Sequence, residues 1–253
     1  MTVRRNLARN HATTQVRRLD DEDLLLDAAK QIVNGRCVLF DFDGPLCRLF
    51  PDRSSKPLAD ALRGIVAEQD ALDLLPPATL VSIDPQDVLR AVDLALPGSD
   101  LVAALEARLV EGEREAAQSA PPTRGASALV RRLAKEGVRI AITTNNSPGA
   151  VDMYLRRMRL RRCFADHLYG RTDNPRRLKP HPDCLDRALR VLGADAGDAL
   201  MFGDTVTDLA AAEKAGVKFV GYARDADEAK ELWEAGAPVV LSRFDHFSTM
   251  IPW

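Results

Sequence analysis

The sequence predicts an α/β protein in which helices cover both faces of a parallel sheet, with a helical unit inserted after the first strand. Three observations support this fold class. Short apolar runs alternate with amphipathic stretches from residue 121 onward, another apolar run lies at residues 37–40, and residues 52–120 contain only helical patterns. Alternating strands and helices are typical of βαβ units, which pair their strands in parallel.

The chain begins with a polar, basic stretch of about 20 residues, which predicts a polar arm that could either pack on the core or remain disordered. Residues 20–33 (DDEDLLLDAAKQIV) follow with apolar residues at helical spacing behind an acidic start, which favours a helix N-terminus. Residues 1–35 are therefore assigned to an N-terminal arm and helix. The next run, RCVLFDFDG at 36–44, ends at Gly44 and Pro45 and predicts a buried parallel strand.

Residues 52–120 differ in character from the rest of the chain. They are rich in Ala and Leu, with apolar spacing near 3.6 in stretches separated by Pro or Gly, so we expect a helical insertion. The remaining core is assigned to residues 36–51 and 121–253. Its expected helices are at 126–137, 147–160, 181–193, 207–216 and 225–236, and its further strands are at 138–144, 164–170, 199–204, 217–223 and 238–243.

Composition narrows the class of protein. The chain has 253 residues, of which 46% are hydrophobic and 28% charged, as in an ordinary globular protein. Its 35 Lys and Arg against 37 Asp and Glu give a net charge of −2, which argues neither for nor against a nucleic-acid partner. No apolar run is long enough for a membrane span, and the N-terminus lacks the apolar region of a secretory signal. Four cysteines without CxxC spacing predict reduced thiols and a cytoplasmic protein.

Polar side chains gather where the predicted strands end. Ligands of open parallel sheets bind at the carboxyl ends of the strands, so these side chains are expected to converge at one edge. They are Asp41 and Asp43 after the first strand, Thr143, Thr144 and Asn145 after the second, Lys179 in a loop before a helix, and Asp204 and Asp208 around the fourth strand.

These residue types predict phosphoryl chemistry. Carboxylates held close together repel one another, and a shared hard cation offsets that cost. Oxygen ligands with no nearby His or Cys indicate Mg²⁺ rather than zinc. A Mg²⁺ site beside a lysine and short polar donors suits a phosphoryl group. One aspartate can act as the nucleophile and form an aspartyl-phosphate, while a second protonates the leaving oxygen and later activates water.

Four short motifs resemble those of the haloacid dehalogenase superfamily, in its phosphatase branch. They are DFDGP at 41–45, ITTN at 142–145, LKPHPD at 178–183 and GDTVTD at 203–208, in the family's order across about residues 36–225. The resemblance is to enzymes of the phosphoglycolate phosphatase and β-phosphoglucomutase type. It implies a Rossmann-like core, with residues 52–120 as a C1-type helical cap that closes over the site and contacts the leaving group.

The resemblance also implies roles for single residues. Asp41 would be the nucleophile and a metal ligand, and Asp43 the general acid/base, with its backbone carbonyl on the metal. An aspartate at position 43 argues for phosphate-ester chemistry over dehalogenation, which has no leaving oxygen to protonate. The remaining roles are phosphate binding for Thr144, Asn145 and Lys179, charge neutralisation for Lys179, and metal binding for Asp204 and Asp208, with Asp208 ligating directly, ligating through water, or orienting Lys179.

The main hypothesis is therefore a Mg²⁺-dependent phosphatase that hydrolyses a small phosphorylated metabolite. The expected partner is this small phosphorylated substrate, with no nucleic acid. A sugar phosphomutase of the β-phosphoglucomutase type is the alternative, because it would use the same core, and a non-catalytic binding module is the third. The five arginines of LRRMRLRRC, residues 155–163, are interpreted as a solvated helix face. Arg171, Arg176 and Arg177 near Lys179 are likewise expected to be surface charges.

Overall fold

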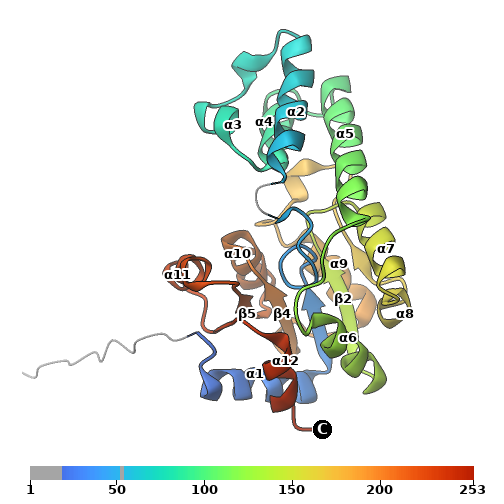
Figure 1. Ribbon diagram of the computed structural model, residues 1–253, viewed down its shortest axis with the longest axis vertical. Helices are drawn as coiled ribbons and strands as arrows, with labels where there is room; N and C mark the ends of the chain where they lie inside the picture. The colour runs from blue at the N-terminus through green and yellow to red at the C-terminus, as the bar shows by residue number, and fades with distance from the viewer. Residues whose placement is uncertain (1–18, 52–53) are drawn as a thin grey trace, which may run out of the picture.

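The structure is a computed structural model that describes residues 19–51 and 54–253, so the predicted arm at residues 1–18 lies outside the described part. Its centre is a six-stranded, all-parallel sheet in the order β3-β2-β1-β4-β5-β6 (Figure 1). This confirms the predicted α/β class. The strands are β1 Cys37–Phe40, β2 Arg139–Thr143, β3 Leu168–Tyr169, β4 Ala199–Gly203, β5 Lys218–Tyr222 and β6 Val240–Leu241.

Each face of the sheet has its own apolar core, as the alternation of side chains along a strand requires. Val38 and Phe40 of β1 belong to one cluster, and Cys37 and Leu39 belong to the other. The first cluster is covered by α1 Glu22–Gly35, α6 Ala126–Lys135, α7 Pro148–Arg157, α8 Arg161–Phe164 and α12 Phe244–Met250. The second is covered by α9 Asp183–Leu192, α10 Val206–Ala215 and α11 Ala226–Glu234. Among the described residues, 3₁₀ turns lie at η2 Leu72–Leu74, η3 Pro175–Arg177 and η4 Ala196–Asp198.

Phe202 of β4 is the centre of an aromatic cluster in the first core. Its ring stacks on Phe40 at 5.3 Å between centroids and meets Phe244 and Phe247 of α12 edge-on at 5.3 and 5.5 Å. Such pairs add to the stabilisation that burial alone provides. α12 is therefore attached to the sheet through two fully buried rings.

The helical insertion comprises α2 Lys56–Glu68, α3 Pro77–Val81, α4 Pro85–Ala95 and α5 Asp100–Ala117, and it forms the upper part of Figure 1. It has its own apolar cluster, to which α2, α4 and α5 contribute. α2 and α5 pack closely because α5 has a glycine, Gly112, where a Cβ would lie 2.6 Å from Leu58. The chain enters and leaves the insertion side by side, with Cys47 and Pro122 in an isolated β-bridge.

Several predicted elements differ at their ends. The expected strand at 164–170 is reduced to Leu168–Tyr169, because Phe164 ends α8 as a buried anchor and Ala165 then turns the chain at φ +46°. The last expected strand is likewise only two residues long. α12 was not predicted, because its seven residues present only two fully buried apolar anchors.

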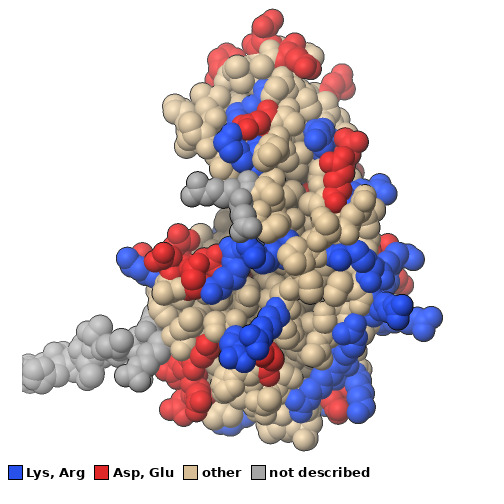
Figure 2. Space-filling model, in the orientation of Figure 1, with Lys and Arg blue, Asp and Glu red and all other residues tan. Residues whose placement is uncertain are grey.

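The arginine-rich run at 155–163 lies at the surface, as expected. Arg156 and Arg161 both pair with Asp152, at 2.6 Å each. Lys and Arg side chains are numerous on the right-hand side of the core in Figure 2, where α7 and α8 lie in Figure 1. The four cysteines are free thiols. Within the described residues, no helix is both long and apolar enough to cross a membrane.

Truncating the aromatic anchor of α12 should weaken the fold strongly. We expect Phe247→Ala to lower the free energy of unfolding by about 3–5 kcal/mol, because it removes a fully buried ring from the cluster around Phe202. Leu94→Ala is the control, since Leu94 is 77% exposed and should change stability by less than about 0.5 kcal/mol. Urea unfolding of both variants measures this, and equal losses in the two would contradict it.

Candidate active site

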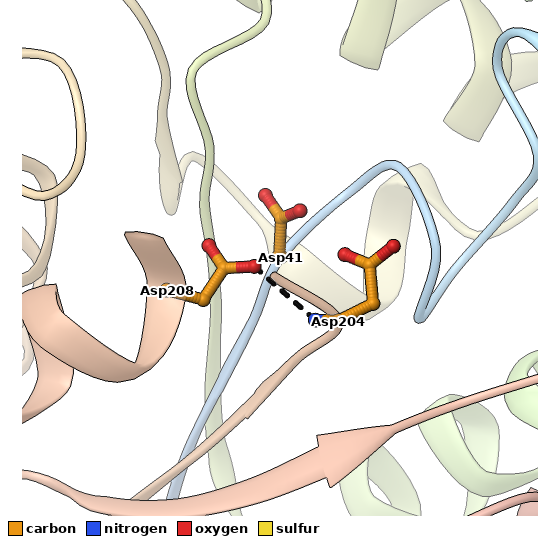
Figure 3. Close-up of side chains that lie close together, drawn as sticks. All are labelled: Asp41, Asp204 and Asp208. Carbon is orange, nitrogen blue, oxygen red and sulfur yellow. Dashed lines mark hydrogen bonds between the residues drawn. The ribbon is translucent and has the colours of Figure 1, made fainter. Parts of the chain in front are cut away.

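The two strands at the middle of the sheet position the acidic residues. Asp41 directly follows β1, and Asp204 directly follows the neighbouring strand β4. The chain order reverses between these strands, and the crevice at such a reversal is where open α/β sheets bind ligands. Figure 3 shows the carboxylates of Asp41, Asp204 and Asp208 grouped at this edge, with oxygens of all three within 4.8 Å of one another.

A glycine lets the chain turn tightly beside Asp204. Gly44 has φ +93°, in the region that glycine adopts readily, and a Cβ there would lie 2.2 Å from the Asp204 carboxylate. Asp43 comes just before this turn, and its Oδ1 accepts a hydrogen bond from the Leu49 amide at 2.7 Å. The DFDG motif thus needs its glycine for both the turn and the close approach of Asp204.

Lys179 lies at the centre of the site. Its Nζ donates to Asp41 Oδ1 at 2.7 Å, to Asp208 Oδ1 at 2.5 Å and to the Thr143 carbonyl at 3.1 Å. The side chain is almost completely buried, which by itself would lower the pKa of the lysine. The carboxylates of Asp208 and Asp41 outweigh that effect, so the pKa is raised and the ammonium stays charged.

Asp208 is held entirely by protein donors. Its Oδ1 binds Lys179, and its Oδ2 accepts from the amides of Asp204 and Thr205 at 3.2 and 3.0 Å and from the Thr205 hydroxyl at 2.8 Å. Thr205 and Asp208 form a capping box at the start of α10. Asp208 therefore both orients Lys179 and fixes the turn that carries Asp204.

Burial raises the pKa values of the other three aspartates. It brings the pKa of Asp41 to about 7, against the opposing effect of Lys179, and that of Asp43 to about 6, against the Leu49 amide. Burial, together with the charges of Asp208 and Asp41, raises the pKa of Asp204 well above its usual range. A divalent cation would offset this repulsion. Asp204 Oδ1 is buried without a hydrogen-bond partner among the described residues, and the all-oxygen donor set fits a hard cation such as Mg²⁺.

Asn145 and Thr144, which follow β2, make different contacts in the site. The Asn145 side chain pairs with the main chain of Lys179, accepting from its amide at 2.7 Å and donating to its carbonyl at 3.3 Å. Asn145 therefore positions the lysine loop with its side chain. The Thr144 hydroxyl donates to Asn146 Oδ1 at 3.0 Å, and Thr144 lines the cavity, whereas Thr143 does not.

The cavity lies between the core and the insertion, with a volume of about 390 Å³. The insertion contributes Asp84, Gln86 and Arg90 of the α4 region to its wall. Arg90 donates to the Lys179 carbonyl at 3.1 Å. The insertion thus reaches the backbone of the residue at the centre of the site. The core side of the cavity is lined by Asp41, Asp43, Thr144, Asn145, Lys179, Asp204 and Asp208, so the structure brings these predicted site residues together and leaves only Thr143 out.

The expectation that Arg171 is a surface charge is wrong. Its side chain is fully buried in an ion pair with Glu113 of α5, whose side chain is also fully buried. Glu113 and Asn146 line the cavity too, and sequence reasoning missed both. A signal for Glu113 did exist, because it lies four residues after Leu109 on the buried stripe of α5. Arg176 and Arg177 are about half exposed and pair with Asp93 and Asp183.

A family model described as haloacid dehalogenase-like hydrolase matches residues 36–216. The chain belongs to the haloacid dehalogenase-like hydrolase family. A phosphoglycolate phosphatase of Rhodospirillum rubrum is 33% identical over 235 residues, covering 86% of this chain and 90% of that protein. The pyrophosphatase PpaX of Bacillus cereus is 35% identical over 89 residues, covering 35% of this chain and 40% of that protein. The phosphatase homologues confirm the predicted class of enzyme.

Solved structures support the fold. A HAD family hydrolase from Deinococcus radiodurans, with bound phosphate and sodium, superposes with a TM-score of 0.53 at 24% identity and covers 86% of this chain and 97% of that one. A hydrolase from Pseudomonas syringae gives a TM-score of 0.60 at 21% identity, covering 83% and 94%. At these identities the likeness shows the fold alone, and it extends over more than four fifths of this chain in both cases.

Removing one buried carboxylate should stabilise the protein when chelator is present. We expect Asp204→Asn to raise the melting temperature more at pH 8 than at pH 5. The folded-state pKa of Asp204 lies above its unfolded value, so the wild type holds an extra proton at low pH and loses stability as pH rises through the folded-state pKa. The neutral amide does not titrate. Thermal unfolding with chelator at both pH values measures the difference.

Asp27→Asn is the matched control, because Asp27 is 73% exposed and pairs only at the surface with Lys30. It should shift the melting temperature little at either pH. An Asp204→Asn effect of the same size at pH 5 and pH 8 would contradict the assignment of a buried, repelled carboxylate.

Proposed function

We propose that the protein is a Mg²⁺-dependent phosphatase that hydrolyses a small phosphate monoester through an aspartyl-phosphate on Asp41. One observation carries the proposal: the Asp41 carboxylate lines the cavity between core and insertion, with one oxygen bound to the buried Lys179 ammonium and two further aspartates within reach of a shared cation. Nucleophile, cationic partner and cation ligands are thus assembled around one point.

Asp41 attacks phosphorus in this mechanism. The hydrogen bond from Lys179 to its Oδ1 fixes the carboxylate, which leaves Oδ2 to form the bond to phosphorus. Lys179 also places its positive charge where the transferred group gains negative charge. The raised pKa of Asp41, about 7, falls once a cation binds beside it, which keeps the carboxylate ionised for attack.

Asp41, Asp204 and the backbone carbonyl of Asp43 would hold Mg²⁺, with Asp208 behind them. The bound ion would neutralise the carboxylates and the phosphoryl oxygens. Of the three roles considered for Asp208, the orientation of Lys179 fits its hydrogen bonds best, because protein donors already bind both of its oxygens. Asp204 is then the main side-chain ligand for Mg²⁺, because its Oδ1 has no hydrogen-bond partner among the described residues.

Asp43 acts as the general acid and then as the general base. Burial raises its pKa to about 6, close to the pH at which a cytoplasmic enzyme would work. The hydrogen bond from the Leu49 amide holds Oδ1, so Oδ2 is the oxygen that gives its proton to the leaving alkoxide. The same oxygen then takes a proton from the water that attacks the aspartyl-phosphate, which releases phosphate and restores Asp41.

In this proposal the Thr144 hydroxyl turns its proton from Asn146 Oδ1 to a phosphoryl oxygen, while it still accepts from the Asn146 amide. The Asn145 backbone binds the phosphoryl group beside it, and the Asn145 side chain keeps the Lys179 loop in place. The helical insertion serves as a cap, because it supplies the wall of the cavity opposite Asp41. Such a cap excludes water and contacts the leaving group. Residues 52–120 therefore decide which phosphate ester is accepted.

The substrate is a small phosphorylated metabolite, as a cavity of about 390 Å³ allows. Phosphoglycolate is the first to test, since the Rhodospirillum rubrum relative is named for it. Arg90, on the wall contributed by the insertion, is a cation that could face a carboxylate on the leaving group.

Phosphate release should depend on both Asp41 and Mg²⁺. With phosphoglycolate, sugar phosphates and an aryl phosphate as substrates, we expect Asp41→Asn to lose more than about 10³-fold in kcat, because the amide cannot form the covalent intermediate. Chelator should stop the wild type in the same way. Asp60→Asn, at an exposed surface ion pair of α2, is the control and should keep wild-type turnover. An isomerised sugar phosphate without free phosphate would instead establish a mutase.

Asp43→Asn should separate the two halves of the reaction. An aryl phosphate has a good leaving group that needs no protonation, so the variant should release about one equivalent of phenol per site in a burst and then stall, because no base activates water. An alkyl phosphate should show no burst. Rapid-quench measurement of phenol and phosphate tests this, and equal loss with both substrates and no burst would refute the role of Asp43.

A further inference from the structure

A fully buried ion pair connects the insertion to the loop that follows β2. The Arg171 Nη1 and Nη2 atoms donate to the two carboxylate oxygens of Glu113 at 2.7 and 3.0 Å, and both side chains have no exposed surface. Glu106, two helical turns earlier on α5, accepts a hydrogen bond from Arg171 Nε at 2.8 Å. Two charges removed from water are stable only where further hydrogen bonds satisfy them, so the position of this pair is tightly determined.

Apart from the bond to Glu106, the further hydrogen bonds of the pair are made with the loop after β2. Glu113 Oε2 accepts from the Ser147 amide at 2.8 Å, and Glu113 Oε1 accepts from Asn146 Nδ2 at 3.2 Å. Arg171 donates to the Asn145 carbonyl from Nη1 at 2.8 Å, and its backbone amide donates to the Asn146 carbonyl at 3.0 Å. The ion pair is thus hydrogen-bonded to three consecutive residues of the loop, Asn145, Asn146 and Ser147.

Asn146 connects the ion pair to Thr144 through hydrogen bonds. Its Oδ1 accepts from the Thr144 hydroxyl at 3.0 Å, and its backbone amide donates to the Thr144 Oγ1 at 3.2 Å. The side-chain amide of Asn146 therefore has Glu113 on one end and Thr144 on the other. A shift of Glu113 would move or rotate the hydroxyl of Thr144, a residue that lines the cavity.

Another ion pair between the insertion and the core is of a different kind. Asp93 of α4 pairs with Arg176, whose side chain is 56% exposed. The Asp93 side chain is buried, but the guanidinium of Arg176 reaches solvent, so this pair is only half enclosed. It holds α4 against η3 without touching the loop at 144–147, and so it provides a comparison for the Glu113 pair.

We propose that Glu113 and Arg171 are positioning residues for the phosphoryl-binding loop: the insertion helix α5 completes the phosphate site by holding Thr144 through Asn146. This inference rests on the proposed phosphatase function, since it concerns the group that would bind the transferred phosphoryl. The insertion is then a structural part of the phosphate site as well as its cover.

Kinetics of paired variants test the proposal. Glu113→Gln keeps the shape of the side chain and leaves Arg171 its second carboxylate, Glu106, so the protein should fold. We expect it to lower kcat/KM about 10- to 100-fold in the wild type, as small misplacements of binding groups do. In a Thr144→Ala background the same change should cost less than about threefold, because the group that it positions is already gone.

Asp93→Asn is the matched control, since it removes a carboxylate that joins insertion to core but has no contact with the loop at 144–147. It should stay within about twofold of its parent in both backgrounds. Asn146→Ala is a second variant that leaves the ion pair in place, and it should show the same non-additivity with Thr144→Ala as Glu113→Gln does. Hydrogen exchange of the Ser147 amide should be faster in Glu113→Gln and unchanged in Asp93→Asn, independently of turnover.

Additive effects of Glu113→Gln and Thr144→Ala, or an effect equal to that of Asp93→Asn, would overturn the positioning role and leave the phosphatase proposal intact. Wild-type protein without turnover on any phosphate ester would overturn the proposed function and this inference with it. Non-additive kinetics together with faster exchange at Ser147 in Glu113→Gln would establish it.

Discussion

One buried ammonium holds the acidic edge of the sheet together. Lys179 stands between Asp41 and Asp208, and without it the crevice between β1 and β4 would contain only carboxylates that repel one another in a place with little water. Its own placement depends on Asn145, which pairs with the Lys179 main chain, and on the Thr143 carbonyl. Residues at the end of β2 thus position the Lys179 ammonium, which balances the carboxylates that follow β1 and β4.

This constraint explains why the surrounding backbone is so specific. Asp208 can bind Lys179 only because a capping box with Thr205 fixes the first turn of α10. Gly203, just before Asp204, leaves room for the same side chain, since a Cβ there would lie 2.5 Å from the Cβ of Asp208. Gly44 does the same for Asp204 on the other side. Glycines and hydrogen-bonded turns therefore surround the closely spaced carboxylates of Asp204 and Asp208. Because these carboxylates repel one another, binding of a cation between them would be favourable.

The strands and the acidic edge could be predicted because both leave local signals. An apolar run ended by acids, as at residues 38–43, marks a buried strand and the residues at its end at once. Arg171 could not be read in this way, because its partner Glu113 is 58 positions away and only the packing of α5 against the core joins them. The side-chain role of Asn145 was hidden for the same reason, since Lys179 comes to it from a separate loop. Short elements such as β3, β6 and α12 were shortened or missed, because their few residues show no periodicity and are held by contacts with the rest of the core.

The insertion starts and ends at neighbouring points of the core, with Cys47 and Pro122 paired, so it looks like a unit that could be exchanged for another of different length. The Glu113 side chain limits that freedom. A graft that replaced Lys56–Ala117 without an acid at the matching turn of its last helix would leave the Arg171 guanidinium with no counter-charge in a dry interior. Chimeras between members of this family would have to transplant the arginine together with the helical unit, or replace both charges with apolar side chains of similar volume. The natural boundary for recombination therefore runs through the loop after β3 as well as through the two points where the chain crosses between units.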